Sequence, residues 1–184
     1  MENLEKLTEQ VRARVEAYWP DFVKDLAAQV AINSERGETE PGFPFGKEPA
    51  RALNAFLDRA AADGFAVDNV DHYAGTVSFG DGAEAIAVLA HLDIVPAGKG
   101  WTSDPFTLVE RDGRLYGRGV TDDKGPAVGA FYGLKIIRDL GLPLRKKIQL
   151  IVGTNEEQGS GCMAYYVQHR PLPSMGFTPD AQYP

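Results

Sequence analysis

The sequence has one cysteine, Cys162, among its 184 residues, so no disulfide bond can form within the chain. A lone cysteine is typical of proteins from a reducing compartment. The sequence also lacks any run of about 18 apolar residues, which excludes a transmembrane helix. The first twenty residues, MENLEKLTEQVRARVEAYWP, are charged throughout and lack the apolar segment of a secretory signal. Together these absences predict a soluble, cytoplasmic protein that does not contact membranes.

Positive charge is scarce as well. The chain has 19 Lys and Arg residues against 26 Asp and Glu residues, a formal net charge of -7. A nucleic-acid-binding surface needs clustered basic residues to neutralise phosphates, so no nucleic-acid partner is expected. The hydrophobic share of 43% is nevertheless ordinary for a globular protein with a buried core. At this length, one domain is the expected organisation.

The spacing of apolar residues predicts the secondary structure. Helices are predicted over residues 2–17, 21–32, 49–62, 126–140 and 160–169, with Pro20 separating the first two. Short β-branched or apolar segments predict strands at FAVDNV, GTVSFG, AIAVLAHLD, KIQLIVGTN and the start of MGFTPD, and FTLVERDGRLYG predicts a hairpin that turns at Asp112-Gly113. In AIAVLA every residue is apolar, which favours a strand covered on both faces. Helices that alternate with buried strands predict an α/β fold with a helix-covered, mixed, mostly parallel sheet.

Four short segments carry most of the residues that could perform chemistry. They are His91-Leu92-Asp93, Thr121-Asp122-Asp123-Lys124-Gly125, Asn155-Glu156-Glu157-Gln158-Gly159 and Thr178-Pro179-Asp180. Three of the segments directly follow a predicted strand, and the other one opens a helix. In open α/β sheets, the carboxyl ends of the strands and the adjoining helix starts converge on one crevice. The sequence therefore predicts that these acidic residues and the histidine lie close together.

Each segment also has a purely structural interpretation. His91 could be a core histidine with Asp93 as its partner, and Asp122 could cap the following helix. Glu156 and its neighbour Glu157 could be solvated acids near a helix N-terminus, where negative charge is favoured. Asp180 could be a turn residue after proline. Any one of these interpretations is easily satisfied, but the placement of all four segments at strand and helix ends favours a shared site.

An acidic crevice of this kind is electrostatically unfavourable without cations. Carboxylates in close contact repel one another, and each resists leaving water. Either some of the carboxylates stay protonated or metal ions neutralise them. Imidazole and carboxylate ligands suit zinc, with cobalt or manganese also possible. Two ions about 3.5–4 Å apart would suit a hydrolytic reaction.

The motifs HLDIVPAGKGW, GRGVTDDKGP, NEEQGSGC and FTPDAQYP together resemble the zinc exopeptidases that include aminoacylases, carboxypeptidase G and PepV-like dipeptidases. PepV-like dipeptidases are the nearest in appearance, and the resemblance runs from about residue 10 to the end of the chain. It implies that dipeptides are hydrolysed by a water activated between two zinc ions, with a small peptide as the substrate. Deacylation of N-acylated amino acids and a non-catalytic metal-binding module are the alternatives.

The resemblance also implies roles for six residues. Four match metal ligands: His91, Asp122, Glu157 and Asp180. Asp122 matches the carboxylate that bridges both metals, and its peptide bond to Asp123 is cis in the family. Two residues match catalytic groups, Glu156 as the general base and Asp93 as the acid that orients the histidine.

The family further uses a histidine ligand near its C-terminus and a separate lid domain, and neither is found in this sequence. The resemblance therefore implies that residues 1–184 are the N-terminal part of a metallopeptidase catalytic domain, without the lid or dimerisation domain and the C-terminal part. We expect this piece alone to be inactive or nearly so. The sequence gives no prediction of the oligomeric state.

Overall fold

A five-stranded sheet forms the centre of the molecule. The structure is a computed structural model that describes residues 2–180, so the last four residues of the FTPDAQYP motif lie outside the described part. The strands occur in the order β1 (Ala66–Val70), β2 (Ala74–Phe79), β6 (Lys147–Gly153), β3 (Ala85–His91) and β7 (Met175–Phe177). The first two pairings are antiparallel, whereas β6–β3 and β3–β7 are parallel. The predicted helix-covered, mixed sheet is confirmed, and its parallel half carries the residues of interest.

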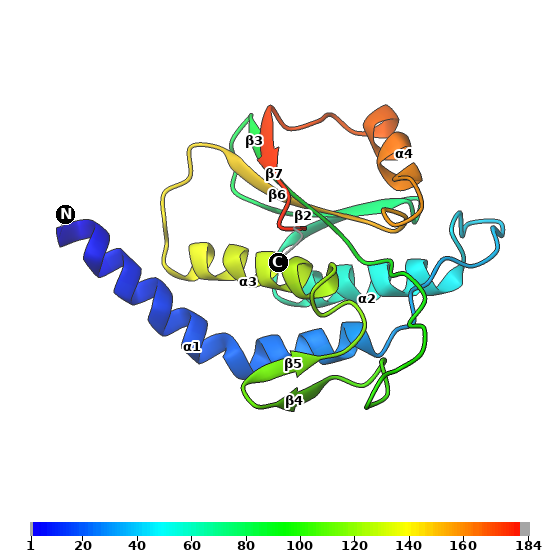
Figure 1. Ribbon diagram of the computed structural model, residues 1–184. Coiled ribbons are helices and arrows are strands. Elements are labelled where there is room, and N and C mark those ends of the chain that lie inside the picture. The colour runs from blue at the N-terminus through cyan, green and yellow to red at the C-terminus, as the bar shows by residue number, and fades with distance from the viewer. Residues whose placement is uncertain (1, 181–184) are drawn as a thin grey trace.

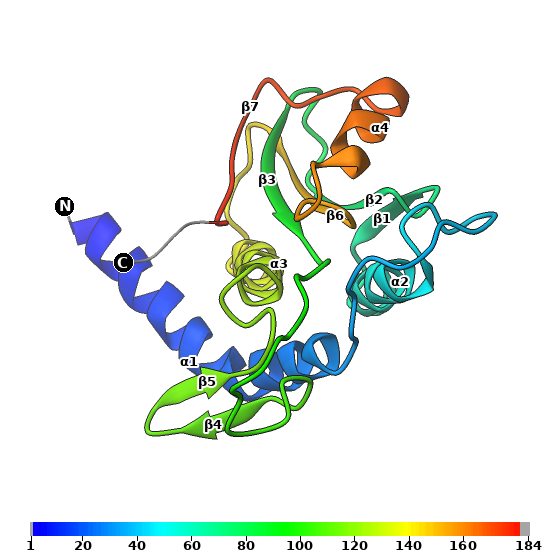
Figure 2. The same cartoon turned by 45° about the vertical axis from the view of Figure 1, so that its right-hand side comes forward.

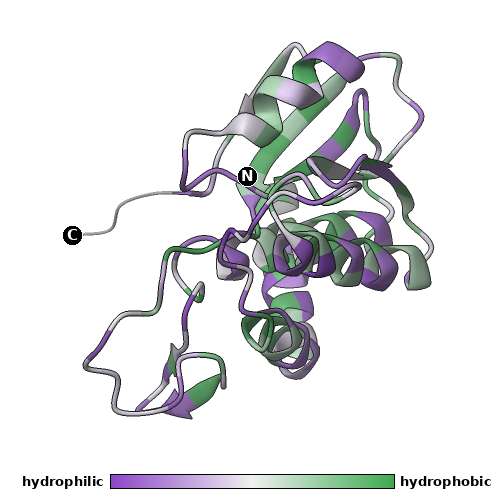
Figure 3. Cartoon of the chain, turned by 90° about the vertical axis from the view of Figure 1, so that its right-hand side faces the viewer, coloured by the Kyte–Doolittle hydropathy of each residue, from purple (hydrophilic) through white to green (hydrophobic). Residues whose placement is uncertain are grey.

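Helices cover both faces of this sheet (Figures 1 and 2). They are α1 (Glu2–Val30), α2 (Lys47–Ala62), α3 (Lys124–Asp139) and α4 (Gly161–His169). Helices α2 and α3 pack on one face, α1 packs against α3, and α4 lies over the opposite face. The helices carry hydrophobic and hydrophilic residues in alternation along their length, as expected when one side of a helix faces the sheet (Figure 3).

Strand β6 shows why the central strands contain few polar residues. Leu150 and Val152 belong to the core between the sheet and the helices α2 and α3, whereas Ile151 belongs to the core beneath α4. Successive side chains of a strand point to opposite faces, and here both faces are covered. Burial on both faces therefore explains the nearly continuous apolar sequence of this strand.

The predicted hairpin is present as β4 (Val109–Arg111) and β5 (Arg114–Tyr116). Its two turn residues, Asp112 and Gly113, have φ angles of 53° and 70°. Positive φ at both central positions is the requirement of the hairpin turn that the Asp-Gly pair predicts. Within residues 2–180, every helix is too short or too polar to cross a membrane.

The prediction of two N-terminal helices, over residues 2–17 and 21–32, is wrong. One helix, α1, continues through Pro20. Proline removes one backbone hydrogen bond and crowds the preceding turn, so it usually ends or kinks a helix. Here Tyr18 before the proline and Phe22 after it both contact the ring of Tyr132 on α3, with ring centroids 5.4 and 5.8 Å away. Packing of both halves against one partner keeps the helix continuous, and Figure 1 shows it bending along its length.

Asp63, at the end of α2, joins α2 to α3. Its carboxylate accepts hydrogen bonds from Arg59, at 2.6 Å, and from Lys135, while its backbone carbonyl accepts one from Arg138 at 2.6 Å. Burial alone would raise the pKa of Asp63, but the hydrogen bonds and charges of Arg59 and Lys135 hold this pKa below its usual value. The ionised carboxylate therefore stabilises the fold at neutral pH.

We expect Asp63→Asn to lower the free energy of unfolding by about 1–3 kcal/mol at pH 7. Because the folded-state pKa is depressed, the contribution is present above the unfolded-state pKa of about 4 and is lost as the pH falls through the folded-state value. Urea denaturation at pH 7 and pH 3 should therefore show a large difference between variant and wild type only at pH 7. Asp21→Asn, at an exposed position of α1, is the control. An equal difference at both pH values would contradict the ionic role of Asp63.

Candidate metal centre

The four acidic segments meet at one edge of the sheet. Strand β3 ends at His91, which pairs in parallel register with Gly153 at the end of β6. The segment Asn155–Glu157 follows β6 directly, and Asp180 follows β7. Helix α3 begins immediately after Asp123. Because β3, β6 and β7 are parallel, their carboxyl ends deliver these side chains to the same place.

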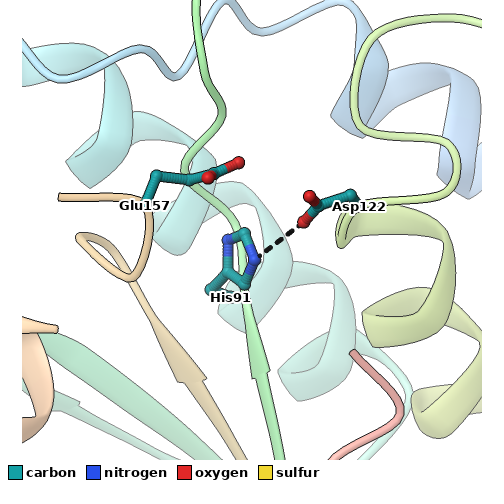
Figure 4. A group of neighbouring side chains, drawn as sticks. All are labelled: His91, Asp122 and Glu157. Atoms are coloured by element: carbon teal, nitrogen blue, oxygen red, sulfur yellow. Dashed lines mark hydrogen bonds and ion pairs between the residues drawn. The ribbon is translucent and has the colours of Figure 1, made fainter. Parts of the chain in front are cut away.

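His91 is the centre of this cluster. Its side chain is only 2% exposed, and its Nε2 atom faces three carboxylates. The distance from Nε2 is 3.0 Å to Asp122 Oδ1, 3.5 Å to Asp180 Oδ2 and 3.9 Å to Glu156 Oε2. Figure 4 shows the imidazole of β3 directed at Asp122, with Glu157 reaching toward the same space from the loop after β6. The predicted proximity of these residues is therefore present.

Asp93 lies on the other side of the imidazole and is 1% exposed. Its Oδ1 atom is 3.3 Å from His91 Nδ1, which also lies 3.0 Å from the backbone carbonyl of Asp93. The same carboxylate accepts the backbone N–H groups of Glu156, at 3.0 Å, and Glu157, at 3.2 Å. Asp93 thus joins the end of β3 to the loop after β6. With Nδ1 engaged on this side, Nε2 is presented to the remaining carboxylates.

Asp123 is fully buried beneath the cluster. Its Oδ2 atom accepts the backbone N–H of His91 at 2.9 Å, and its buried Oδ1 atom has no hydrogen-bond partner within residues 2–180. Burial raises the pKa of Asp123 to about 7. The peptide bond between Asp122 and Asp123 is cis, as the resemblance implied. The sequence placed Asp123 in the cluster but gave it no role of its own, because nothing in the pattern distinguishes it from its neighbour.

Among the described residues, two groups of side chains could hold a metal ion. They are His91 with Asp122 and Glu157, and His91 with Asp123 and Asp180. Within each group the potential ligand atoms all lie within 4.8 Å of one another. His91 is common to both groups, whereas the resemblance implies that Asp122 is the shared ligand. Asp122 Oδ1 lies 3.0 Å from Nε2 of this common histidine, so Asp122 is also close to the atom that the two groups share.

The electrostatics of the cluster fit a divalent cation. Burial alone would lower the pKa of His91, but the hydrogen bond to Asp93 and the nearby carboxylates raise this pKa to about 10. Burial raises the pKa of Glu157, and the charge of Asp122 adds to the effect. Both shifts show that the site favours added positive charge, as a proton or as a metal ion. An imidazole nitrogen and several carboxylates, including the buried Oδ1 of Asp123, form a donor set that suits a divalent ion such as zinc, cobalt or manganese.

Comparisons with known proteins point to one family. The family model described as "Peptidase family M20/M25/M40" matches residues 87–182. The putative dipeptidase YtjP of Bacillus subtilis is 45% identical over 166 residues, which cover 89% of this chain and 36% of that protein. The Beta-Ala-Xaa dipeptidase of Lactobacillus delbrueckii subsp. lactis is 44% identical over 167 residues, which cover 89% of this chain and 35% of that protein.

A solved structure extends the likeness to the fold. The crystal structure of human carnosine dipeptidase 1 matches with a TM-score of 0.78 and 27% identity, covering 95% of this chain and 41% of that one. The chain thus spans just over a third of the length of the two curated relatives.

Proposed function

The chain belongs to the peptidase family M20/M25/M40, and on this basis we propose that it forms the N-terminal part of the catalytic domain of a zinc-dependent dipeptidase. The observation that carries the proposal is the arrangement around His91, where Nε2 faces the carboxylates of three segments and Nδ1 is held by Asp93. The names of the two curated relatives support a dipeptide as the substrate of the complete protein. The buried free thiol of Cys162 suits the cytoplasmic location that we include in the proposal.

The proposed ligands come from all four segments. They are His91, Asp122, Glu157 and Asp180, as the resemblance implies. Asp93 orients the imidazole, since a buried carboxylate on the second nitrogen of a histidine fixes its tautomer and raises its basicity. Asp123, whose buried Oδ1 has no hydrogen-bond partner among the described residues, is an additional candidate.

The reaction that this arrangement supports is hydrolysis of an amide bond. Bound zinc ions would supply Lewis acidity, which polarises a carbonyl and lowers the pKa of a coordinated water. Glu156 is the proposed general base, because its side chain is 47% exposed and its Oε2 atom lies 3.9 Å from His91 Nε2. A group at this position can accept a proton from the attacking water and then donate it to the leaving amine. The backbone N–H of Glu156 is hydrogen-bonded to Asp93, and this bond fixes the point from which the carboxylate of Glu156 extends.

Chelation and substrate choice together test the proposal on the complete protein. We expect removal of the metal to reduce the hydrolysis of unblocked dipeptides by at least about 100-fold, because a catalytic metal contributes several kcal/mol to the stabilisation of the transition state. Zinc, cobalt and manganese should then be added back separately. Restoration by zinc supports the dipeptidase, whereas an enzyme that retains its activity without metal contradicts it.

The choice of substrate separates the alternatives. Preference for N-acylated amino acids over unblocked dipeptides would favour the deacylase. Bound metal without turnover of either substrate would favour a non-catalytic metal-binding module. A β-alanyl dipeptide belongs in the substrate set, because the Lactobacillus relative is named for that class.

A further inference from the structure

Lys124 is a fully buried lysine that has no role in the proposed function so far. It is the first residue of α3 and follows Asp122 and Asp123 in the chain. Its Nζ atom donates hydrogen bonds to the backbone carbonyls of Gln29, at 2.8 Å, and Ile32, at 2.6 Å. These carbonyls lie at the end of α1 and two residues beyond it, and each also accepts a backbone N–H: Gln29 from Ile32 at 3.1 Å, and Ile32 from Ser34 at 2.8 Å. The side chain therefore ties the start of α3 to the end of α1.

The loop before α3 is shaped around the stem of this lysine. Gly119 has a φ angle of 86°, and a Cβ atom at this position would lie 2.9 Å from Cδ of Lys124. Gly125 donates its backbone N–H to the carbonyl of Gly119 at 3.1 Å, and a Cβ on Gly125 would lie only 2.0 Å from the carbonyl oxygen of Val120. Gly119 thus provides space for the stem of the buried lysine, and Gly125 allows the start of α3 to approach Val120 closely. A surface lysine would not require this arrangement.

The segment that follows α1 contacts the part of the chain that contains the histidine. Ser34, which is fully buried, donates its hydroxyl to the carbonyl of Leu92 at 2.5 Å. Leu92 stands between His91 and Asp93, so this contact fixes the end of β3. A further bridge links Glu35 to the residue after Asp93. The chain around the end of α1 is therefore bonded to Lys124, which follows Asp123, and to Leu92, which follows His91.

We propose that Lys124 is a positioning residue for the metal centre. Its two hydrogen bonds hold Asp122 and Asp123 at the distances from His91 that the two candidate groups of metal ligands require. Asp122 needs such an anchor, because its own side chain is 56% exposed and its one described hydrogen bond is to His91. A primary amine keeps two N–H donors in either protonation state, so both hydrogen bonds are possible with or without the charge. The inference rests on the proposed function, because it assumes that a cation binds at His91.

Cobalt binding to the metal-free complete protein tests this inference. Lys124→Met keeps most of the length of the side chain but removes its donors, and we expect it to weaken Co²⁺ binding by about tenfold or more and to alter the Co²⁺ absorption spectrum. Lys135→Met is the matched control. Lys135 is also a buried lysine of α3, but it lies about three helical turns from Lys124 and its amine bonds to Asp63. The control variant should lose stability and still bind Co²⁺ as the wild type does.

Gly119→Ala is the second variant, for the case that Lys124→Met does not fold. It crowds the stem of the lysine and leaves its ammonium group intact, and we expect it to weaken Co²⁺ binding in the same direction. If the folded variants at Lys124 and Gly119 bind Co²⁺ like the wild type, the lysine has only a structural role and the inference is overturned, while the proposed function stands. If the wild type itself binds no Co²⁺, the proposed function fails and the inference fails with it.

Discussion

Replacing Glu156 by glutamine should reduce the turnover of the complete protein by about 10²–10⁴-fold and leave its metal content unchanged. Glutamine has the same size and can keep the backbone hydrogen bond to Asp93, but its amide cannot accept a proton from water. Glu156 belongs to neither group of candidate metal ligands among the described residues, so the affinity for metal should not depend on its charge. Steady-state kinetics on an unblocked dipeptide, together with metal analysis of the same sample, measure both quantities.

Glu110→Gln provides the control for this experiment. Glu110 is an exposed residue of β4, so the same chemical change occurs there away from the cluster. We expect this variant to hydrolyse the dipeptide as the wild type does. If Glu156→Gln loses metal along with turnover, Glu156 is a ligand and not a base. If its turnover is unchanged, the assignment of the general base is wrong.

The position of the site could be predicted because the sequence shows where the parallel strands end, and the ends of parallel strands lie together. Strands β3 and β6 are covered on both faces, so their sequences are almost continuously apolar and their ends are marked by the first charged residues. His91 and Glu156 stand at those ends. The carboxyl ends of parallel neighbours lie at the same edge of the sheet, which predicts that residues distant in sequence are close in space.

Helix α1 shows where local rules fail. The prediction of a break at Pro20 used the backbone cost of proline, which is a property of the residue itself. The continuous helix depends on packing against α3, more than a hundred residues away, which local spacing does not reveal. Propensity is a weak prior wherever tertiary contacts compete with it.

The hydrogen bonds inside the site could not be predicted from the sequence for a related reason. The hydrogen bonds of Asp93 to two backbone N–H groups involve no side chain of the partner residues, so no motif records them. The environment of Asp123 Oδ1, which is enclosed without a partner in the described part of the chain, likewise depends on burial by the surrounding fold. Motifs identify which residue types are present, whereas backbone donors and burial become known only when the chain is folded.

These contacts of Asp93 lead to the second large expected effect. Asp93→Asn should weaken the affinity for metal by about 10–100-fold and lower the free energy of unfolding by about 1–3 kcal/mol. In the wild type both oxygens of Asp93 accept backbone N–H groups, at 3.0 and 3.2 Å, in a position that is 1% exposed. Asparagine has one acceptor oxygen, so in either orientation its NH₂ group must face one of these two backbone N–H groups. A buried donor without an acceptor is costly because it cannot regain its hydrogen bond with water.

Asp104→Asn is the matched control for this variant. Asp104 also accepts a backbone N–H, that of Phe106 at 2.9 Å, but it lies in an exposed loop where water can replace the lost contact. Titration of the metal-free protein with Co²⁺ and urea denaturation measure the two expected effects separately. Loss of stability with unchanged Co²⁺ binding would limit Asp93 to joining β3 to the loop after β6. Unchanged values for both would contradict its role beside His91, since a neutral side chain would then serve the imidazole equally well.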